Sequence, residues 1–579
     1  MYFSLVAQSF EKIEYTSSRI EMTQILAQLL TQASPEQASI IAYLSLGVLQ
    51  PPYIGTQFNL AQKSLIPVIA KLCDITLEQV NKELSELGDL GLVVQQYNWG
   101  GNSSKTVIQV YDELSALVSI VGTGSVEEKS QRLVDFLRGI DSLSAKFILR
   151  IIMGTLRLGF SDMTLIDALS WMCVGDKSLR GIIEDGYNRC ADIGLIARVL
   201  KEQGIKAIEE MHVKVGIPIR PASAERLPSA AEIIKKIGSC VAQPKLDGFR
   251  LQIHLDKTSH KIVTRFFSRH LTDMSHMFPD LTKEVEKLNV QSLICEGEAI
   301  VFDPQTKTFL PFQETVKRKR KHGIEQAIEE FPLQVFLFDL LYLNGEELIN
   351  YTHVERRIQL LDVLKNYSGD SIQVLSEKSI DTVQELEKYF YENVSSGLEG
   401  IVVKRPNAIY QPGKRNFNWI KLKRQEEGHL EDSIDCVVLG YYFGAGKRAQ
   451  FGIGAFLVGV YNKSCDCFET VAKVGTGLTD DEWRELKTKC ENLKSAHQPN
   501  NVIVSKDLVP DRWVYPEIVT LIRADEITMS PVHSAGKTEQ KLGYALRFPR
   551  FMGYRPDKSA YECTSVDELK RLYDDQFIK

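Results

Sequence analysis

Apolar residues recur at helical spacing over much of the first third of the chain. Segments such as TSSRIEMTQILAQLL, EKSQRLVDFLRGI and LSAKFILRIIMGTLRLG place them every three or four residues, and no proline occurs between Pro67 and Pro218. Ser34 followed by Pro35 before an apolar run is typical of a helix start. We therefore predict a mainly helical domain over residues 1–222.

Two stretches interrupt or end this helical pattern. GTGSVEEKSQRL, residues 122–133, predicts a Gly/Ser turn that opens a helix. The free N–H groups of such a helix start suit a phosphate, although a plain capped helix explains the stretch equally well. Three prolines fall close together among small and polar residues at 215–230, which indicates an interdomain linker.

Short apolar runs then alternate with helical patterns, which predicts an α/β domain over residues 223–428. One of its helices opens with Thr352 and Glu355, the spacing of a capping box. Beyond this point the chain is rich in Val, Gly and Tyr, with one helix at TDDEWRELKTKCENL. We predict a C-terminal β-barrel over residues 429–579.

Composition narrows the class of protein but leaves its chemistry open. A chain of 579 residues with 44% hydrophobic and 25% charged residues is typical of a soluble multidomain protein. It has no apolar run of the roughly 18 residues that a membrane helix needs, and the N-terminus does not resemble a signal peptide. We therefore expect an intracellular protein, cytoplasmic if prokaryotic.

Charge and cysteine content add little. The net charge of −6 argues weakly against a nucleic-acid partner, but it averages over the surface, and local basic faces are what bind phosphates. The basic run at 317–321 fits a solvated helical face better than a localisation signal. Ten scattered cysteines without a C-x-x-C pair predict free thiols and no zinc site.

KLDGFR, residues 245–250, is the first candidate for chemistry. Strand alternation places Lys245 and Asp247 on one face, and Gly248 allows a ligand to approach the backbone. Lys245 could attack a phosphate, provided that its amine is neutral; neighbouring cations favour the neutral form. A lone lysine is more often a solvated surface residue, so the interpretation depends on the residues around it.

Polar residues recur at strand spacing elsewhere in the predicted α/β domain. Glu296 and Glu298 share a strand face, as do Lys421 and Lys423. Glu399, Lys404, Arg269 and the aromatic Phe338 lie in similar apolar contexts. If the fold gathers these side chains, they make a site for a nucleoside triphosphate with magnesium.

The ordered series KLDGFR, FSRH, CEGE, FDLLYLNG, EGIVVK, WIKLKR and LRFPRF resembles the motifs of the ATP-dependent DNA ligases. The resemblance covers nearly the whole chain and is strongest to the archaeal and eukaryotic replicative type. MGTLRLGFSDMTLIDALS is similar to that family's DNA-binding domain, and RADEITMSPVH to its OB-fold. The resemblance implies an all-helical DNA-binding domain, an α/β adenylation (nucleotidyltransferase) domain and a C-terminal OB-fold.

The resemblance also implies roles for individual residues. Lys245 is the expected catalytic nucleophile, and Glu298 and Glu399 the expected Mg²⁺ ligands. ATP-binding roles are implied for Gln243, Lys245, Arg250, Arg269, Glu298, Phe338, Arg415, Lys421, Lys423, Arg547 and Arg550. Among these, Phe338 would stack on adenine, while Arg547 and Arg550 would orient the leaving pyrophosphate. Gln243 replaces an acid common in the family, which puts a side-chain contact to the adenine amino group in doubt. His270 replaces a common asparagine after Arg269.

The implied activity is the sealing of nicks in duplex DNA, through lysyl-AMP and 5′-adenylated DNA, in replication, repair and recombination. An RNA ligase or another lysyl-nucleotidyltransferase is the alternative enzyme, and a catalytically inactive nick-binding scaffold the alternative of another class. We expect a monomer with ATP and Mg²⁺ as cofactors and nicked duplex DNA as partner. QKSLIPVI, residues 62–69, faintly resembles a sliding-clamp peptide but fits an ordinary amphipathic helix better.

Overall fold

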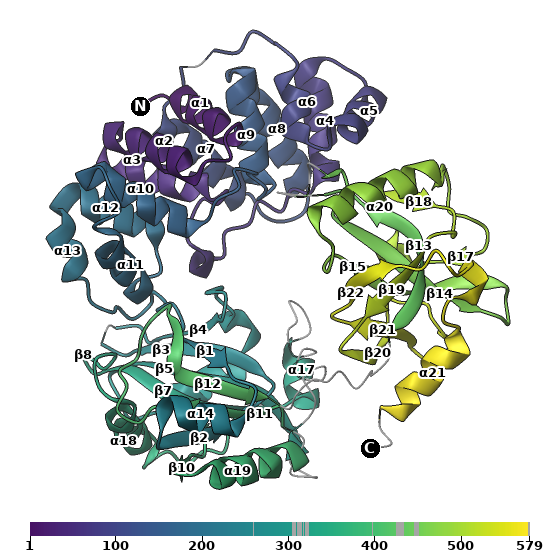
Figure 1. The fold of residues 1–579 in the computed structure, drawn as a ribbon. Helices are drawn as coiled ribbons and strands as arrows, with labels where there is room; N and C mark the ends of the chain where they lie inside the picture. Colours follow the sequence, from purple (N-terminus) through teal and green to yellow (C-terminus); the bar gives the residue numbers. More distant parts are fainter. Residues whose placement is uncertain are drawn as a thin grey trace. The chain divides into compact units, whose positions relative to one another are not determined.

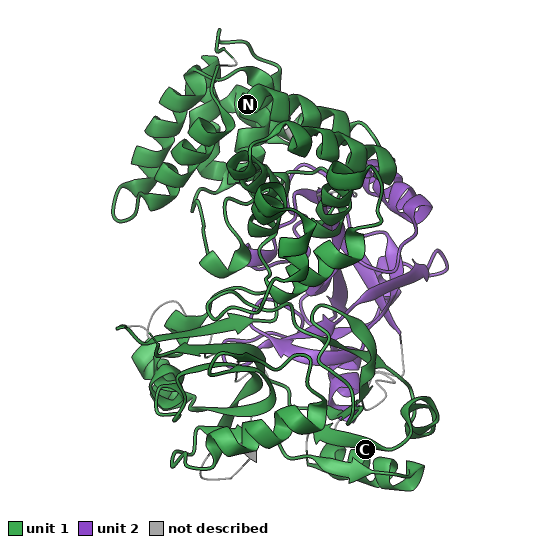
Figure 2. Ribbon diagram, turned by 90° about the vertical axis from the view of Figure 1, so that its left-hand side faces the viewer, with its two compact units in different colours: residues 1–424 green, residues 425–579 purple. Residues whose placement is uncertain are grey.

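The structure is a computed structural model that describes residues 1–102, 104–258, 260–303, 308–309, 315, 318, 324–396, 398–423, 433–444, 448 and 451–576. The chain divides into two compact units, residues 1–424 and residues 425–579 (Figure 2). The predicted domain borders at 222/223 and 428/429 stay predictions. Among the described residues, no helix combines the length and the apolar character needed to cross a bilayer.

The N-terminal part of the first unit is helical, as predicted (Figure 1). Its elements are α1 Phe3–Glu14, α2 Arg19–Gln32, α3 Pro35–Ser45, η1 Pro52–Ile54, α4 Gln62–Cys73, α5 Leu77–Leu87, α6 Leu90–Gln95, α7 Val107–Ser119, α8 Ser125–Arg138, α9 Ser142–Ile152, α10 Asp162–Val174, α11 Arg180–Arg189, α12 Ile193–Gln203 and α13 Ile205–Glu209. Their apolar stripes pack into one core that extends from Phe3 to Ile208.

Local signals set several of these helix boundaries. Ser34 caps α3 in a capping box with Gln37, as its position before Pro35 indicates. The turn before α8 ends at Gly124, whose φ of 82° is left-handed, so the predicted Gly turn opening a helix is confirmed. QKSLIPVI forms the start of α4 and buries Leu65 and Ile69, which confirms the helix; a clamp contact remains untested.

The α/β part of the first unit contains two mixed sheets. Its elements are β1 Ser223–Arg226, α14 Ala230–Ile237, β2 Cys240–Pro244, β3 Phe249–Asp256, β4 Val263–Ser268, η2 Ser275–Met277, α15 Pro279–Val285, β5 Ser292–Asp303, β6 Thr308–Phe309, α17 Ile324–Glu330, β7 Leu333–Leu343, β8 Glu346–Glu347, α18 His353–Leu364, β9 Ile372–Val374, β10 Lys378–Ile380, α19 Val383–Ser395, β11 Gly400–Lys404 and β12 Arg415–Lys423. The Thr352 and Glu355 capping box opens α18 as predicted.

Strand alternation gives each sheet one apolar and one polar face. The five-stranded sheet, in order β1-β12-β11-β2-β10, packs residues such as Ala242, Ile401 and Ile420 against α14 and α19. The other sheet, built around β4-β3-β5-β7-β8, buries Leu251 and Cys295 in a separate core. The polar faces of both sheets are therefore left to line the site described below.

The second unit is built on a strongly curled sheet, which agrees with the predicted C-terminal barrel. Its elements are β13 Ile434–Tyr442, β14 Ala455–Asn462, β15 Cys467–Val474, α20 Asp480–Asn492, β16 Lys494–Ser495, β17 Val502–Ile503, η4 Lys506–Leu508, β18 Arg512–Val514, β19 Val519–Arg523, β20 Glu526–Ser530, β21 Gly543–Arg547, β22 Arg550–Tyr554, η5 Ala560–Glu562 and α21 Val566–Asp575. Strand β13 pairs with β14 on one side and with β18 and β19 on the other. The predicted helix at TDDEWRELKTKCENL is α20.

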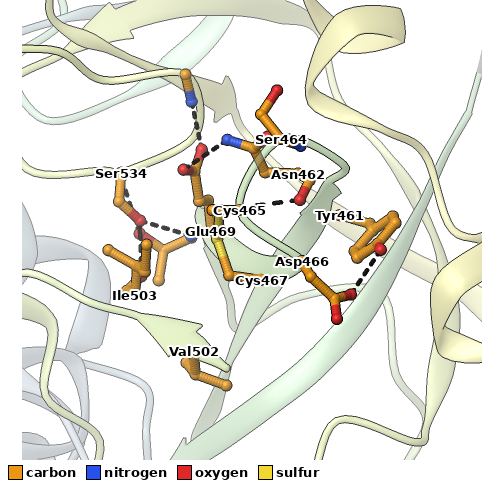
Figure 3. The surroundings of a disulfide bond; sticks show 12 residues. Tyr461, Asn462, Ser464, Cys465, Asp466, Cys467, Glu469, Val502, Ile503 and Ser534 are labelled. Atoms are coloured by element: carbon orange, nitrogen blue, oxygen red, sulfur yellow. Dashed lines mark hydrogen bonds between the residues drawn. A yellow bond between two sulfur atoms is a disulfide. The ribbon is translucent and has the colours of Figure 1, made fainter. Parts of the chain in front are cut away.

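Two expectations about surface residues need correction. Most of the basic run at 317–321 lies outside the described residues, but Arg318 is buried and pairs with Asp280 at 2.5 Å, so this side chain is not solvated. The prediction of ten free thiols is wrong at Cys465 and Cys467, which form a disulfide (Figure 3). Cys465 lies in the turn between β14 and β15 and Cys467 begins β15, so this turn brings the two sulfur atoms together.

The segment predicted as an interdomain linker is bound to the α/β part by buried side chains. Gln252 accepts a hydrogen bond from the Ile219 N–H at 2.8 Å and donates to the Ile219 carbonyl at 3.0 Å. His254 Nδ1 accepts from the Gly216 N–H at 3.0 Å, and its Nε2 lies 3.0 Å from Gln252 Oε1. These bonds satisfy the backbone of an otherwise irregular segment, so it is not a free tether.

His254 gives this attachment a predicted pH dependence. Burial, with a smaller contribution from Arg265, lowers the pKa of His254 from 6.5 to about 3. Between these pH values the unfolded chain binds a proton that the folded chain does not, so stability falls as the pH falls. We expect the stability difference between the wild type and His254→Gln to shrink by about 1.4 kcal/mol per pH unit below pH 6.5.

Urea unfolding of both proteins at about pH 7 and about pH 5 measures this difference, and the variant corrects for all other titrating groups. A difference that stays constant over this range would contradict the account.

Candidate functional site

A pocket of about 940 Å³ lies between the polar faces of the two sheets. Its walls combine the predicted nucleophile with aromatic, cationic and carboxylate side chains. Of the predicted site residues, those lining it are Gln243, Lys245, Arg250, Arg269, Glu298, Phe338 and Lys421. Its volume falls in the range of small-molecule sites.

The five-stranded sheet presents its polar face in three rows that cross β12, β11 and β2. The first row holds Trp419, Lys404 and Val241, the second Lys421, Val402 and Gln243, and the third Lys423, Gly400 and Lys245. Successive rows are two residues apart along each strand, about 6.6 Å. An aromatic row therefore lies at one end of this face and Lys245 at the other.

Lys245 contacts a carboxylate that it shares with a second lysine. Its Nζ forms an ion pair with Glu399 Oε2, and Lys423 Nζ lies 3.2 Å from the same oxygen. The side chains of Lys245 and Glu399 are about a quarter exposed, so the pair borders the pocket and is not sealed in the core. These three predicted site residues are thus brought together.

Lys421 completes the cationic part of this wall. Burial lowers the pKa of Lys421, and the neighbouring charges of Lys423, Arg415, Lys245 and Arg269 lower it further. Cations that share one face repel one another, and a bound anion such as a triphosphate would relieve this repulsion. Arg415 is exposed and does not line the pocket, but its charge acts on Lys421 from the same strand face.

The facing wall comes from β3 and β5. Arg250 donates to both oxygens of Glu296 at 2.9 and 3.1 Å, and Tyr410 Oη donates to Glu296 at 2.9 Å. A further bond at 2.8 Å joins Arg250 to the carbonyl of Ala222. Arg250 also lies 5.5 Å from the centres of the aromatic rings of Phe338 and Trp419, so its guanidinium is fixed from several sides.

Of the carboxylates on this wall, Glu298 has its negative charge least compensated by nearby cations. It accepts a bond from the Gly248 N–H at 3.2 Å, which ties the KLDGFR turn to β5. Burial raises the pKa of Glu298 to about 7, although Lys245 and Arg250 oppose the rise. Gly248 is required here for a reason other than ligand access, because a Cβ at this position would lie 2.3 Å from the Ala299 carbonyl oxygen.

Phe338 rests on a buried charge cluster. Lys404, 1% exposed, donates to the Phe338 carbonyl at 3.0 Å and lies 3.8 Å from Asp339. Arg356 binds both oxygens of Asp339 at 2.6 and 3.1 Å. Opposing burial, Arg356 and then Lys404 hold the pKa of Asp339 below its usual range. This cluster fixes the position of the aromatic ring from behind.

Gln243 has a partly buried partner, Glu377, that the sequence analysis did not identify. Its Nε2 donates to Glu377 Oε2 at 2.8 Å, and His353 Nε2 lies 2.7 Å from the same oxygen. Trp419 and Tyr410 were missed as well. Glu377, Trp419 and Tyr410 are each distant in sequence from the residues that they contact. Of the three, only Trp419 had a sequence signal, namely its position beside Lys421.

Arg547 and Arg550 belong to the second unit. Arg547 pairs with Glu526 at 2.5 Å and Arg550 with Asp525 at 3.1 Å, and both side chains are substantially exposed. Their expected action on a leaving pyrophosphate remains a prediction.

Three family models match successive parts of the chain. "DNA ligase N terminus" matches residues 2–170, "ATP dependent DNA ligase domain" residues 221–423, and "ATP dependent DNA ligase C terminal region" residues 449–558. "Probable DNA ligase" of Dictyoglomus turgidum is 44% identical over 99% of this chain and 97% of its own length. The chain belongs to the ATP-dependent DNA ligases.

Further relatives agree with this assignment. "DNA ligase" of Sulfolobus acidocaldarius is 36% identical over the whole of this chain and 99% of its own. A solved structure described as "Pmar-Lig_PreS3" shares the fold, with a TM-score of 0.56 and 17% identity over 95% of this chain and 99% of its own. The ligase is thus a nucleotidyltransferase that uses ATP and a divalent metal ion, and the alternative of an RNA ligase is not favoured.

The buried cluster behind Phe338 predicts a large stability cost in this ligase. Arg356→Met leaves the Asp339 carboxylate buried with its main partner gone, which should cost about 3–5 kcal/mol in the free energy of unfolding. Chemical denaturation measures the loss. Arg198→Met is the matched control, because Arg198 is 54% exposed and pairs with Glu202 on the surface of α12; we expect almost no change there. Equal effects of the two substitutions would refute the assignment.

Proposed function

We propose that this ligase seals nicks through a covalent AMP adduct on Lys245. The observation that carries the proposal is the position of Lys245 at the pocket edge, in ion-pair contact with Glu399 and in the same row as Lys423. Arg269 and Lys421 line the same pocket, so phosphates placed beside Lys245 would meet several cations.

The proposed reaction has three group transfers. The neutral amine of Lys245 attacks the α-phosphorus of ATP, a P–N bond forms, and the P–O bond to pyrophosphate breaks. An oxygen of the 5′-phosphate at the nick then attacks the same phosphorus, and the P–N bond breaks. Finally the 3′-hydroxyl, losing its proton, attacks the 5′-phosphate and AMP leaves. The product is a continuous strand, and lysine is restored.

The roles of the remaining residues follow from their positions. Phe338, Arg250, Arg269 and Lys421 line the pocket, and we expect Phe338 to stack on the base and the two arginines to contact ribose and phosphates. Lys421, Lys423 and Arg415, whose charges act on one another, would surround the α-phosphate. Arg547 and Arg550 of the second unit would orient pyrophosphate, which requires that unit to close over the pocket during the first step. Roles in replication, repair and recombination, and action as a monomer, belong to this proposal.

Glu298 and Glu399 fit a divalent metal ion. Their carboxylate oxygens are the hard ligands that Mg²⁺ prefers. Among the described residues only the Gly248 N–H bonds to Glu298, and its raised pKa, about 7, shows that nearby cations do not fully compensate its charge. When bound, the metal would neutralise phosphate charge as it develops. Lys245 and Lys423 hold Glu399 in place, and it would lie beside the phosphates of a nucleotide bound near Lys245.

Radiolabel transfer tests the role of Lys245. With α-labelled ATP and magnesium, the wild type and the surface control Lys283→Ala should both retain label on the protein, whereas Lys245→Ala should retain none. Addition of nicked duplex DNA should discharge the label as the nick is sealed. Label that forms but resists discharge by nicked DNA would contradict the proposed substrate, and label on Lys245→Ala would contradict the proposed nucleophile.

Metal binding can be tested separately from catalysis. Glu298→Gln removes a carboxylate but little volume, and we expect the affinity for Mn²⁺ to fall by about tenfold or more. Titration of Mn²⁺ followed by electron paramagnetic resonance measures the free ion directly. Glu329→Gln, on the exposed face of α17, serves as the control. Equal Mn²⁺ affinity in all three proteins would rule out Glu298 as a ligand.

A further inference from the structure

Two cysteines and a glutamate lie close together where the chain turns from β14 into β15 (Figure 3). Cys465 is exposed in the turn, and Cys467 and Glu469 follow on β15, where residues two apart share one face. One sulfur atom of each cysteine and a carboxylate oxygen of Glu469 all lie within 4.8 Å of one another. None of the three residues lines the nucleotide pocket.

Glu469 carries a buried negative charge. The residue is 7% exposed, and its two oxygens accept hydrogen bonds from the Asn462 side-chain amide at 2.9 Å and from the Gly536 N–H at 2.6 Å. Both donors are neutral, and in the part of the chain that the structure describes no lysine, arginine or histidine forms an ion pair with this carboxylate. Buried charges in proteins are normally paired or bound to a metal ion. A cation beside Glu469 would therefore compensate its charge.

The turn that carries the cysteines is held by its own hydrogen bonds. Asn462 Oδ1 accepts from the Ser464 N–H at 2.9 Å, and the Tyr461 hydroxyl donates to Asp466 at 2.7 Å. Asp466, between the two cysteines, has a left-handed φ of 50°, a conformation that aspartate tolerates. These features do not involve the bond between the sulfur atoms. Two reduced thiols would therefore remain near each other and near Glu469.

This set of donor atoms suits zinc better than magnesium. Thiolates are soft ligands, and zinc takes sulfur and carboxylate ligands in tetrahedral geometry. Zinc bonds of about 2.0–2.3 Å place neighbouring ligand atoms roughly 3.3–3.8 Å apart, which fits within the 4.8 Å that these atoms span. The sulfur atoms can separate to such a distance only when the disulfide is reduced. Because Cys465 is exposed, a water molecule can take the fourth position.

We propose that Cys465, Cys467 and Glu469 bind a zinc ion when the two cysteines are reduced and release it when they are oxidised. Reduction adds two electrons and two protons to the S–S bond, and each thiol then loses its proton as it binds the ion. In the reverse direction a small-molecule disulfide takes up two electrons and two protons and leaves as two thiols, while the bond between the cysteines forms again. The inference goes beyond the proposed function and does not depend on it.

Bound zinc would strengthen a junction inside the second unit. Glu469 holds the Gly536 N–H, which belongs to the segment between β20 and β21, whereas the cysteines belong to the turn between β14 and β15. Beside this contact, the hydroxyls of Thr470 and Ser534 lie 2.9 Å apart. An ion that binds the folded state stabilises it, so zinc should raise the stability of the reduced ligase and not that of the oxidised one.

Cobalt(II) tests the site on the wild-type ligase. Co²⁺ occupies tetrahedral zinc sites, and a thiolate bound to it gives a charge-transfer band in the near ultraviolet. One sample is reduced with a phosphine and another is oxidised with glutathione disulfide, and both are freed of reagent. Alkylation and peptide mass spectrometry determine whether Cys465 and Cys467 are free or joined. We expect the band in the reduced sample, saturating at one Co²⁺ per chain and removed by Zn²⁺, and no band in the oxidised sample.

Several results on the wild type would overturn the inference. One is a reduced sample with both thiols free that shows no band. Another is a band of equal strength in the oxidised sample. A pair of cysteines whose state is the same after both treatments would refute the control by thiol oxidation.

Variants assign the band to the three residues. Cys465→Ser with Cys467→Ser should abolish the band under reducing conditions, whereas Cys173→Ser, which removes an exposed thiol of α10, should leave it unchanged. Glu469→Gln keeps both thiolates but removes the charged oxygen, so the affinity for Co²⁺ should fall by about tenfold or more. Glu517→Gln, exposed in the same unit, is the matched control.

The variants can also refute the assignment. A band that survives the loss of both cysteines would place the ion on other thiols, and equal affinity in the wild type and in Glu469→Gln would exclude the carboxylate as a ligand. If a variant does not fold, the comparison of the reduced and oxidised wild type still decides the proposal.

Discussion

A strand can offer a charged side chain to a pocket only if its alternate residues are buried on the other side. Both sheets of the α/β part obey this constraint. The lysines and Gln243 of the five-stranded sheet alternate with the apolar residues that pack under α14 and α19, and Glu296 and Glu298 alternate with residues of the second core. The pocket depends on this alternation, because a slip of one residue in register would turn the polar face inward.

Some charged side chains of this pocket have partners of opposite charge and others do not, and the uncompensated charges suit a charged ligand. Arg250 with Glu296, and Arg356 with Asp339, are buried pairs joined by two hydrogen bonds each, which fix the walls. Among the residues that the structure describes, Glu298 has no such partner, and the cations around Lys421 repel one another. A metal ion and a triphosphate would supply the missing charges, so the ligase is arranged for the loaded site and not for the empty one.

Much of this arrangement can be predicted from local patterns in the chain. Helical periodicity, the caps at Ser34 and Thr352, and strand alternation depend on neighbours within a few residues, and the structure confirms the helices, the caps and the shared faces of Glu296 with Glu298 and of Lys421 with Lys423. The predicted alternation at Lys245 is wrong, because residues 245–248 connect β2 to β3 and belong to neither strand. Contacts between distant segments carry no such signal. The hydrogen bond between Glu377 and Gln243 forms only when the sheets bring these segments together. The same is true of the hydrogen bonds that join Gln252 and His254 to residues 216–219. The pairing of Cys465 with Cys467 was missed because only C-x-x-C spacing was considered.

The most direct test of the central claim is to map the adenylated residue by peptide mass spectrometry after reaction with ATP and magnesium. Four lysines face the same pocket wall or its border, namely Lys245, Lys404, Lys421 and Lys423. The account predicts AMP on the peptide that contains Lys245 and none on the other three. AMP on Lys421 or Lys423 would contradict it, because those side chains would then be nucleophiles and not the cations that hold the phosphate.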